Sequence, residues 1–532
     1  MLADKLLQVP LQDAAAICCV LFCLSVLATW WSERRKIQAL GGHASRVRNY
    51  LPMGLDLTYA AVKGQLYYRS LEWWNDLLKD HHTVEATLSA ERMIFTDDPE
   101  NIKAVLAGQF RDFGKGEPFH RDWSDFLGDS IFTTDLEQWH DSRQLIRPQF
   151  IKDRVSDLET FERHVSKLLD KIGGNGEPVD IQSLLFRYTL DAITDFLLGE
   201  SVNSLDNPQL EFAEAFQQVQ QLQSIIAKAG KLSRFVPRRK FHKNLKIINE
   251  FVQPYIENAL RLSPTELEEK TKSDSDYTFL HALAGFTRDR KVVRDQLVAV
   301  LLAGRVCPFP ITPLSPNSPQ QDTTAASLSW LFHELSHNPT IVARLRAEIL
   351  STVGPSTVPT YSALKSMKYL QHTLSETLRL YPGVPFNLRL ALHDTSLPRG
   401  GGPLGTLPVG CPKDTPIAYS TLKLHRRADL YPAPSPAFPP VHLFAPDRWD
   451  HWTPRSWQYI PFNGGPRICI GQQFALAEMA YTVVRVLQRF DRVESRPRLG
   501  REAVEMRAEI VLQPAGEVRV GFWEAEGEKG EG

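Results

Sequence analysis

Cysteine is scarce in this sequence, and the few cysteines present do not form metal-binding pairs. The 532 residues contain six of them, and none makes a C-x-x-C pair of the zinc type. The full set is Cys18, Cys19, Cys23, Cys307, Cys411 and Cys469. This usage argues against a disulfide framework and predicts a reducing compartment around the main domain.

The chain also lacks an excess of charge of either sign. Lys and Arg number 61 against 62 Asp and Glu, a formal net charge of −1, so nothing in the composition indicates a nucleic-acid partner. Internal repeats, a P-loop and a Rossmann G-x-G-x-x-G are absent as well. What is present is a hydrophobic share of 43% with 23% charged residues, which is ordinary for a globular protein with a large core.

Composition divides the chain into one large domain and two short flanking segments. No break between residues 50 and 520 marks a boundary, so we expect a single domain over residues 37–523. An N-terminal segment covers residues 1–36. The tail, residues 524–532, is rich in Glu and Gly and is predicted to be disordered.

The N-terminal segment contains an uncharged apolar run from Ala14 to Trp31. That length just spans a bilayer core, and the run ends in Trp30-Trp31 followed by the basic residues of 34–36. The sequence therefore predicts a single transmembrane helix at about residues 14–31, with the main domain in the cytosol. The alternative is a cleaved signal peptide, although the bulky Trp pair makes a poor cleavage site.

Helical periodicity dominates the rest of the chain and predicts a mostly α fold with small β-sheets (α+β). The predicted helices are Asp141–Phe150, Val155–Ile172, Pro208–Ala229, Lys243–Leu262, Lys291–Gly304, Thr323–His337, Thr340–Thr352 and Tyr369–Leu380. The predicted strands are Thr83–Leu88, Phe386–Leu392, Ile510–Gln513 and Val518–Phe522. We expect the last two strands to pair with each other across Pro514-Ala-Gly-Glu.

The most informative stretch runs from Phe462 to Gly471 and presents Cys469 as a metal thiolate. Its glycines suit a tight loop whose backbone N–H groups approach the sulfur. An apolar, helix-prone run follows, which puts the sulfur near a helix N-terminus, where the dipole favours a thiolate. Arg467 is placed to reach an anionic group. The alternative is a buried structural cysteine in a glycine turn.

The pattern F-x-x-G-x-R-x-C-x-G, from Phe462 to Gly471, resembles the haem-thiolate loop of the cytochrome P450 family. The resemblance implies a P450-like fold that binds haem b, with Cys469 as the iron ligand and Arg467 on a haem propionate. Phe462 belongs to the same cofactor-binding loop. The thiolate would donate electron density that favours cleavage of the O–O bond.

A second motif, Glu376-Thr-Leu-Arg379, has helical i, i+3 spacing, so its two charges are expected to pair on one face. Alone it is also typical of a solvated surface pair. The spacing to Cys469 and the segment Pro446-Asp-Arg448-Trp match the P450 arrangement, in which Arg448 joins the pair in a buried network. The resemblance therefore implies a structural role for Glu376, Arg379 and Arg448, a lock under the haem.

Two further segments supply basic residues that the resemblance places on the haem propionates. Trp139 and Arg143 have W-x-x-x-R spacing, which sets the indole and the guanidinium one turn apart on a helix. Arg389 lies on the predicted strand Phe386–Leu392. Each of these arginines alone would be an ordinary surface residue.

The oxygen-activating segment of the family reads Ala/Gly-Gly-x-Asp/Glu-Thr within one long helix. Here its two halves are Ala303-Gly304-Arg and Asp322-Thr323, and residues 306–321 lie between them. The resemblance implies that Asp322 and Thr323 relay protons to dioxygen. The inserted segment has five prolines in sixteen residues, so it cannot continue a helix.

Residues 306–321 have two readings. One is a genuine surface loop. The other is translated intron sequence, because sixteen residues correspond to forty-eight nucleotides, which preserve the reading frame. The Val-Cys codons GTN-TGY match a 5′ splice site, and a final Gln codon can end in AG. Deletion of the segment would restore one uninterrupted helix through Asp322 and Thr323.

Within the family, segments such as Gly114–His120 and Leu397–Gly402 resemble the fungal n-alkane and fatty-acid hydroxylases. The resemblance implies a monooxygenase that hydroxylates the terminal carbon of a lipid-like substrate. Electrons would come from NADPH through a separate NADPH–cytochrome P450 reductase, at the endoplasmic reticulum membrane. Two alternatives stay open, a haem binder whose catalysis the insertion impairs and a haem-thiolate isomerase or dehydratase.

Overall fold

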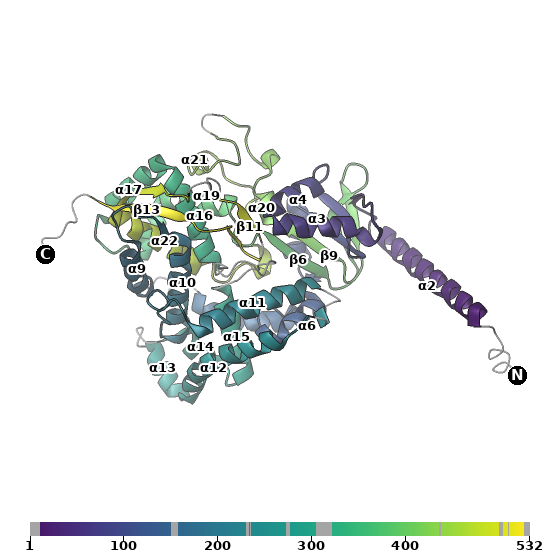
Figure 1. The fold of residues 1–532 in the computed structure, drawn as a ribbon, viewed down its shortest axis with the longest axis horizontal. Coiled ribbons are helices and arrows are strands. Elements are labelled where there is room, and N and C mark those ends of the chain that lie inside the picture. Colours follow the sequence, from purple (N-terminus) through teal and green to yellow (C-terminus); the bar gives the residue numbers. More distant parts are fainter. Residues whose placement is uncertain are drawn as a thin grey trace.

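The computed structural model describes residues 11–150, 158–229, 233–234, 236–272, 277–304, 322–435, 438–498, 504–508 and 510–525. The predicted insertion, residues 306–321, lies outside them, as does the predicted tail from residue 526 onward. The described chain is mostly helical with small sheets, which confirms the predicted fold class (Figure 1).

The helices account for most of the described residues. Their bounds are α2 (Leu11–Ala39), α3 (Leu55–Leu66), α4 (Ser70–Leu77), α5 (Pro99–Lys103), α6 (Gly116–Leu127), α7 (Leu136–Ile146), α9 (Glu159–Ile172), α10 (Ile181–Leu198), α11 (Glu211–Ala229), α12 (Arg239–Arg261), α13 (Pro264–Lys272), α14 (Phe279–Phe286), α15 (Arg290–Ala303), α16 (Thr323–His337), α17 (Pro339–Val353), α18 (Tyr361–Ser366), α19 (Lys368–Leu380), α20 (Thr421–Leu424), α21 (Arg448–His451) and α22 (Gln472–Arg489).

The strands among the described residues are short and form four small sheets. Their bounds are β1 (Ser45–Arg46), β2 (Thr83–Leu88), β3 (Glu91–Thr96), β4 (Phe113–Gly114), β5 (Val179–Asp180), β6 (Phe386–Ala391), β7 (Thr395–Gly401), β8 (Leu407–Cys411), β9 (Pro416–Ser420), β10 (Phe490–Ser495), β11 (Met506–Ala508), β12 (Leu512–Pro514) and β13 (Arg519–Glu524). The largest sheet has the order β1-β2-β3-β9-β6-β4, and a second has the order β10-β13-β5.

The predicted pairing between the last two strands is wrong. Strand β12 pairs antiparallel with β11, while β13 pairs with β10 and β5. The Pro514-Ala-Gly-Glu segment therefore links two different sheets instead of forming a hairpin. β13 also continues to Glu524, one residue into the segment expected to be disordered.

Two helices differ from their predicted bounds in ways that the sequence explains. α7 begins at Leu136 and ends at Ile146, where a 3-10 turn over Arg147–Phe150 replaces the predicted continuation, because Pro148 cannot supply a helical N–H. α2 is longer than the predicted 14–31 and continues through the charged residues to Ala39, before Gly41 adopts a φ of 133°. Charged residues are good helix formers, so only the glycines end it.

Most of the core lies between helices, and its largest cluster includes buried side chains of α10, α16 and α22. Leu328, Leu331 and Phe332 of α16 are fully buried. In Figure 1 the helical part makes up one side of the molecule, while the sheet with β6 and β9 lies toward α2, which projects outward. α16 and α22 bring Asp322 and Cys469 into this core region, since each of those residues lies within three residues of its helix's start.

Candidate active site

The loop that carries Cys469 is closed by its own backbone. The Cys469 N–H donates to the Phe462 carbonyl at 3.0 Å, and a 3-10 turn over Gly465–Arg467 fills the space between them. α22 begins at Gln472, which confirms the predicted helix directly after the cysteine. The loop therefore places the sulfur near a helix N-terminus.

Gly465 is required by the geometry of this loop. Its φ is +66°, and a Cβ added there would lie 1.9 Å from the Leu106 carbonyl oxygen. A side chain would both strain the backbone and displace that carbonyl. The loop and the segment at Leu106 can approach this closely only because the residue is glycine.

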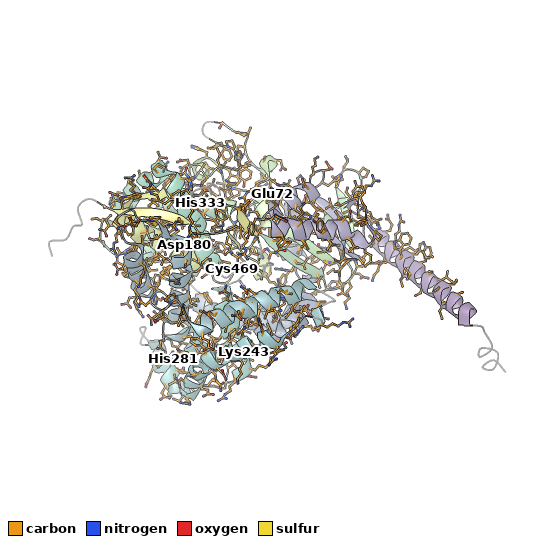
Figure 2. The ribbon with its side chains drawn as sticks, viewed as in Figure 1. Glu72, Asp180, Lys243, His281, His333 and Cys469 are labelled. Atoms are coloured by element: carbon orange, nitrogen blue, oxygen red, sulfur yellow. The ribbon has the colours of Figure 1, made fainter. Side chains whose placement is uncertain are left out.

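Cys469 is exposed, and desolvation by the protein around it still raises the pKa of its thiol. The Gly471 backbone and the Arg143 charge oppose that rise. Figure 2 shows Cys469 near the middle of the molecule in this view.

Arg467 turns from the same loop into a partly buried polar and aromatic environment. Its Nη2 donates to the Thr134 carbonyl at 2.8 Å and to Asp135 Oδ1 at 2.6 Å. Its guanidinium carbon lies 4.8 Å from the Trp139 ring centroid. Its Nε is buried and has no hydrogen-bond partner among the described residues. This orphaned donor leaves Arg467 able to bind a further acceptor.

The structure brings Trp139 and Arg143 of α7 to the same place. Arg143 Nη1 donates to the Ile468 carbonyl at 3.0 Å, next to Cys469 in the chain. The Arg143 guanidinium carbon also lies 5.8 Å from the Trp139 ring centroid. The predicted helical spacing thus sets both residues against the cysteine loop.

Arg389 reaches the same region from strand β6, and so does a lysine that sequence reasoning missed. Arg389 is buried and donates to the Leu388 carbonyl at 2.8 Å. Burial lowers the pKa of Lys115 well below its usual range, and the charges of Arg389 and Arg467 lower it further. Lys115 lies in the Gly114–His120 segment, but no pattern in the sequence indicates that it would lie near these arginines.

Asp135 is the second residue that the sequence did not reveal. Its carboxylate accepts from the backbone N–H groups of Lys115 at 2.9 Å and Gly116 at 2.7 Å, besides Arg467. A Cβ on Gly114 would lie 2.6 Å from this carboxylate. Asp135 therefore joins the cysteine loop to the start of α6.

We call four side chains the cation cluster: Lys115, Arg143, Arg389 and Arg467. Burial lowers the pKa of Arg467 to about 10, and the charges of Arg389 and Arg143 act in the same direction against Asp135. One carboxylate does not balance these four cations, of which Arg389 is buried and the other three are partly buried, so the cluster favours an added anionic group. A haem with two propionates fits this donor set, with the thiol of Cys469 beside it.

Glu376, Arg379 and Arg448 also lie together, and all three side chains are fully buried. Arg379 donates to Glu376 through Nε at 2.7 Å and Nη2 at 2.8 Å, the two-pronged geometry that suits a guanidinium and a carboxylate. Arg448 Nε reaches the same carboxylate at 3.2 Å. The Trp449 indole N–H and the Ala445 backbone N–H add two more donors, at 3.1 Å and 3.0 Å.

The two arginines are satisfied beyond this carboxylate by backbone carbonyls. Arg448 donates to Pro439, Pro440 and Leu443 at 2.8–3.2 Å. Arg379 donates to His425 and Leu443, each at 3.3 Å. A network of charges with no exposed member and several backbone partners holds separate chain segments together, which suits a structural part.

Asp322 and Thr323 stand at the start of α16, after residues that the structure does not describe. Asp322 is the N-cap, and its Oδ1 accepts from the Thr324 N–H at 2.6 Å and the Ala325 N–H at 3.4 Å. Thr323 packs on Gly383, where an added Cβ would lie 3.3 Å from its own Cβ. α15 ends at Ala303, so these residues begin a new helix instead of continuing one.

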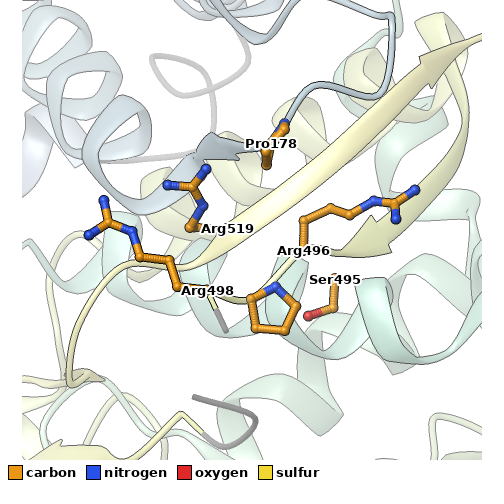
Figure 3. A pocket seen from close by; sticks show the side chains of 6 residues that line it. Pro178, Ser495, Arg496, Arg498 and Arg519 are labelled. Carbon is orange, nitrogen blue, oxygen red and sulfur yellow. The ribbon is translucent and has the colours of Figure 1, made fainter. Parts of the chain in front are cut away.

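A separate pocket of about 470 Å³ opens at the β10–β13 strand pair (Figure 3). It is lined by Pro178, Ser495, Arg496, Pro497, Arg498 and Arg519. Arg496 pairs with Glu494, and Arg498 and Arg519 pair with Glu517. Its lining shares no residue with the cation cluster or the cysteine loop, so we do not include it in the candidate active site.

Comparison with known proteins agrees with the geometry around Cys469. The family model described as Cytochrome P450 matches residues 75–303 and 320–518 and leaves out the residues between, close to the bounds of the predicted insertion. The chain is similar to "Cytochrome P450 monooxygenase pvhE" of Talaromyces variabilis, with 48% identity over 528 residues, 96% of this chain and 94% of the relative.

Two other relatives cover somewhat less of the chain. "Cytochrome P450 52A1" of Candida tropicalis is 38% identical over 500 residues, 89% of this chain and 87% of the relative. "Cytochrome P450 monooxygenase g430" of a Fusarium species is 37% identical over 477 residues, 84% of this chain and 79% of the relative. All three matches extend far beyond the cysteine loop, so the similarity is one of the whole fold.

Proposed function

This chain belongs to the cytochrome P450 family and is a P450 monooxygenase, and from that premise we propose that it hydroxylates an aliphatic substrate at the terminal carbon. The substrate class is an n-alkane or a fatty acid. Haem held by a cysteine thiolate is the family's cofactor, and it supplies the iron at which dioxygen is activated. The observation that carries the proposal is the exposed Cys469 beside the cation cluster, whose Arg143 donates to the neighbouring Ile468 carbonyl.

The proposal assigns each residue of the loop and of the cation cluster a part in holding the haem. Cys469 is the axial ligand, and Phe462 and Gly465 shape the loop that presents it. The cation cluster and the Trp139 indole bind the two propionates, and the orphaned Nε of Arg467 is one of the donors. Asp135 holds Arg467 in place through its 2.6 Å contact.

The substrate class rests on the resemblance of Gly114–His120 and Leu397–Gly402 to the fungal n-alkane and fatty-acid hydroxylases. The 38% identity to a P450 of the 52A group supports it. The 48% identity to pvhE, whose name specifies no substrate, makes product analysis the deciding test.

A P450 monooxygenase requires a redox partner, and we infer that NADPH–cytochrome P450 reductase fills this role. α2 is one apolar helix long enough to cross a membrane, as an anchor requires. The proposed location is the endoplasmic reticulum membrane, with the catalytic domain in the cytosol. The basic residues that follow the apolar run support this orientation.

A second candidate function is a haem binder with impaired turnover. One observation favours it, the separation of α15 from α16 at the position where the family has one helix. Asp322 acts as a helix cap there, so its carboxylate is already engaged by two backbone N–H groups. The cysteine loop and the cation cluster do not depend on that junction, so haem binding would survive.

One experiment separates these candidates. The full chain, in membranes with reductase and NADPH, is given dodecane or dodecanoic acid, and products are identified by mass spectrometry. A thiolate-type carbon-monoxide difference spectrum with a terminal alcohol product supports the proposed hydroxylase. The same spectrum without any product would favour the impaired haem binder, and no thiolate-type spectrum would refute both. Cys469→Ser serves as the control that loses the spectrum.

A further inference from the structure

The last turns of α16 carry two histidines that the proposed monooxygenase function does not use. The sequence His333-Glu334-Leu-Ser-His337 has the H-E-x-x-H pattern, and all of it lies within the helix. Residues four apart lie on one face of a helix, and this spacing lets two imidazoles bind a single metal ion. Such a pattern also occurs by chance, and only the placement of the two rings distinguishes a metal site from a coincidence.

The two imidazole rings lie close together without stacking face to face. The ring centroids of His333 and His337 are 4.6 Å apart, and the ring planes are inclined by 59°. Two imidazoles that bind one zinc ion through nitrogens at about 2.0–2.1 Å have ring centroids about 4.5–5.5 Å apart. The separation in the structure lies within this range, so the backbone of α16 already holds the rings at the spacing that a shared ion needs.

A hydrogen bond determines which nitrogen of His337 is free to bind. Its Nδ1 lies 2.7 Å from the His333 carbonyl oxygen, and a carbonyl only accepts, so Nδ1 carries the proton. The Ser336 hydroxyl donates to the same carbonyl at 2.7 Å, so its proton is already used there. The neutral His337 ring then has its lone pair on Nε2, and a hydrogen bond from the other ring nitrogen to a carbonyl is how metal-binding histidines are oriented. His337 is exposed, so an ion can reach it from solvent.

His333 is half-buried, and its ring is neutral and held in place. Neither of its ring nitrogens has a hydrogen bond within the described part of the chain. Burial, and after it the charge of His337, lowers the pKa of His333 to about 4, and the neutral imidazole is the form that binds a metal ion. The Trp330 ring packs edge-on against it at 5.8 Å. Trp330 is fixed in turn by its hydrogen bond to the Leu512 carbonyl and by stacking on Tyr381.

Glu334, the glutamate of the pattern, does not complete a hydrolytic zinc site. In such a site the glutamate is the general base, and a third protein side chain joins the two histidines on the metal. Here the Glu334 carboxylate accepts from the Tyr381 hydroxyl at 2.5 Å. The described residues also contain no group of three or more His, Cys, Asp or Glu side chains that could hold a metal ion. The pair therefore suits an ion with two protein ligands and water in its other positions.

We propose that His333 and His337 bind one divalent transition-metal ion at the C-terminal end of α16, through Nε2 of His337 and a ring nitrogen of His333. Imidazole suits zinc, copper and nickel ions, and the C-terminal end of a helix dipole favours a cation. The site is separate from the haem site, since His333 lies ten residues beyond Thr323, about 15 Å along α16, and Figure 2 shows it above Cys469 in that view. The metal site therefore does not depend on the proposed function.

The first test measures zinc binding and needs no turnover. The purified full chain, loaded with haem in detergent, is dialysed against Zn²⁺ at pH 7, and bound zinc is measured by elemental mass spectrometry. Loss of a group that only orients a metal ligand weakens binding about 10–100-fold, so loss of a ligand itself should weaken it at least about 100-fold. The wild type should bind one more zinc ion per chain than His333→Gln or His337→Gln. Equal zinc binding by the wild type and His337→Gln would overturn the proposal.

His242→Gln is the matched control. His242 is also exposed and lies on a helix, α12, but it has no histidine four residues before or after it. Zinc binding by this variant should equal that of the wild type. An equal loss in His242→Gln and in the two α16 variants would show that single exposed histidines bind the zinc, and it would refute a site formed by the pair. If His333→Gln fails to load haem, the exposed His337→Gln decides the test alone.

The second test identifies the ligands and their dependence on the fold. X-ray absorption at the zinc edge should show two imidazole nitrogens at about 2.0–2.1 Å, with oxygen atoms in the other positions. Zinc should also raise the unfolding temperature of the wild type and not that of His337→Gln, because the helical spacing of the pair exists only in the folded state. A spectrum without two imidazoles, or an equal rise in unfolding temperature in both proteins, would overturn the proposal.

Discussion

Replacement of Glu376 by alanine should strongly destabilise the folded domain. The carboxylate accepts five hydrogen bonds in the structure, three from Arg379 and Arg448 and two from Trp449 and Ala445. Without it, two guanidinium groups that are 0% exposed remain in the core with no negative charge. Backbone carbonyls still accept from both arginines, which limits the loss but does not supply a charge.

Removal of one partner from a buried charge network costs about 3–5 kcal/mol. A typical domain has a free energy of unfolding of about 5–15 kcal/mol, so this change takes a large part of the total. Glu376→Gln keeps an acceptor for Arg379 and loses only the charge, so its loss should be smaller. We therefore expect folded, haem-loaded protein to decrease in the order wild type, Glu376→Gln, Glu376→Ala.

The assay is urea unfolding followed by circular dichroism, together with the yield of protein that shows the thiolate-type carbon-monoxide spectrum. The matched control is Glu100→Ala, which removes an i, i+3 pair with Lys103 whose side chains are about half exposed. An exposed pair contributes about 0–1 kcal/mol, so this control should unfold almost as the wild type does. Normal stability of Glu376→Ala with slower turnover would refute the structural reasoning and point to a part in catalysis.

Other predictions follow from the site and its surroundings. Cys469→Ser should abolish the thiolate-type absorbance, and its survival would mean that another residue binds the iron. Asp180→Asn should stabilise the protein by about 1–3 kcal/mol at pH 7. Burial raises the pKa of Asp180 to about 6, so the folded wild type loses stability as pH rises from about 4 to 6. Equal stability of the two proteins at pH 7 would contradict this. Removal of residues 2–36 should release most of the protein from carbonate-washed membranes, and full retention would indicate a second anchor. Deletion of residues 306–321 should raise turnover with the carbon-monoxide spectrum unchanged, whereas a full chain as active as the deletion, from a transcript that retains the forty-eight nucleotides, would contradict the intron hypothesis.

Local signals were sufficient for several elements. The strand Thr83–Leu88 and the helix Thr323–His337 have the predicted bounds. The helix has strong punctuation in the sequence, since Asp322 is a good N-cap and Asn338 and Pro339 interrupt the helix pattern at its end. Spacing along one helix also brought Trp139 and Arg143 together as predicted.

Long-range pairing could not be predicted in the same way. The segment 510–513 has strand character, but its partner is β11 and not β13, because the choice depends on which backbone the folded helices bring near. Lys115 and Asp135 are more than 330 residues from Arg467 in the chain. In the sequence alone, Lys115 and Asp135 look like ordinary surface residues, because nothing there shows that the fold brings them near Arg467.

The end of α2 has a mechanical consequence for the whole enzyme. The helix has 29 residues, about 44 Å at 1.5 Å per residue, against a bilayer core of about 30 Å. Its last turn packs on β8 so closely that a Cβ on Gly410 would lie 2.3 Å from the Ile37 carbonyl oxygen, and the buried Ile37 side chain and an ion pair from Lys36 to Asp394 fix it further.

These contacts fix the orientation of α2 relative to the domain. If α2 spans a bilayer, its tilt and the tilt of the catalytic domain should change together, because the last turn of α2 packs on β8. A thinner bilayer requires a larger helix tilt, so lipid thickness would change the tilt of the domain relative to the membrane surface. The bilayer thickness would then determine the orientation of the catalytic domain through the tilt of α2.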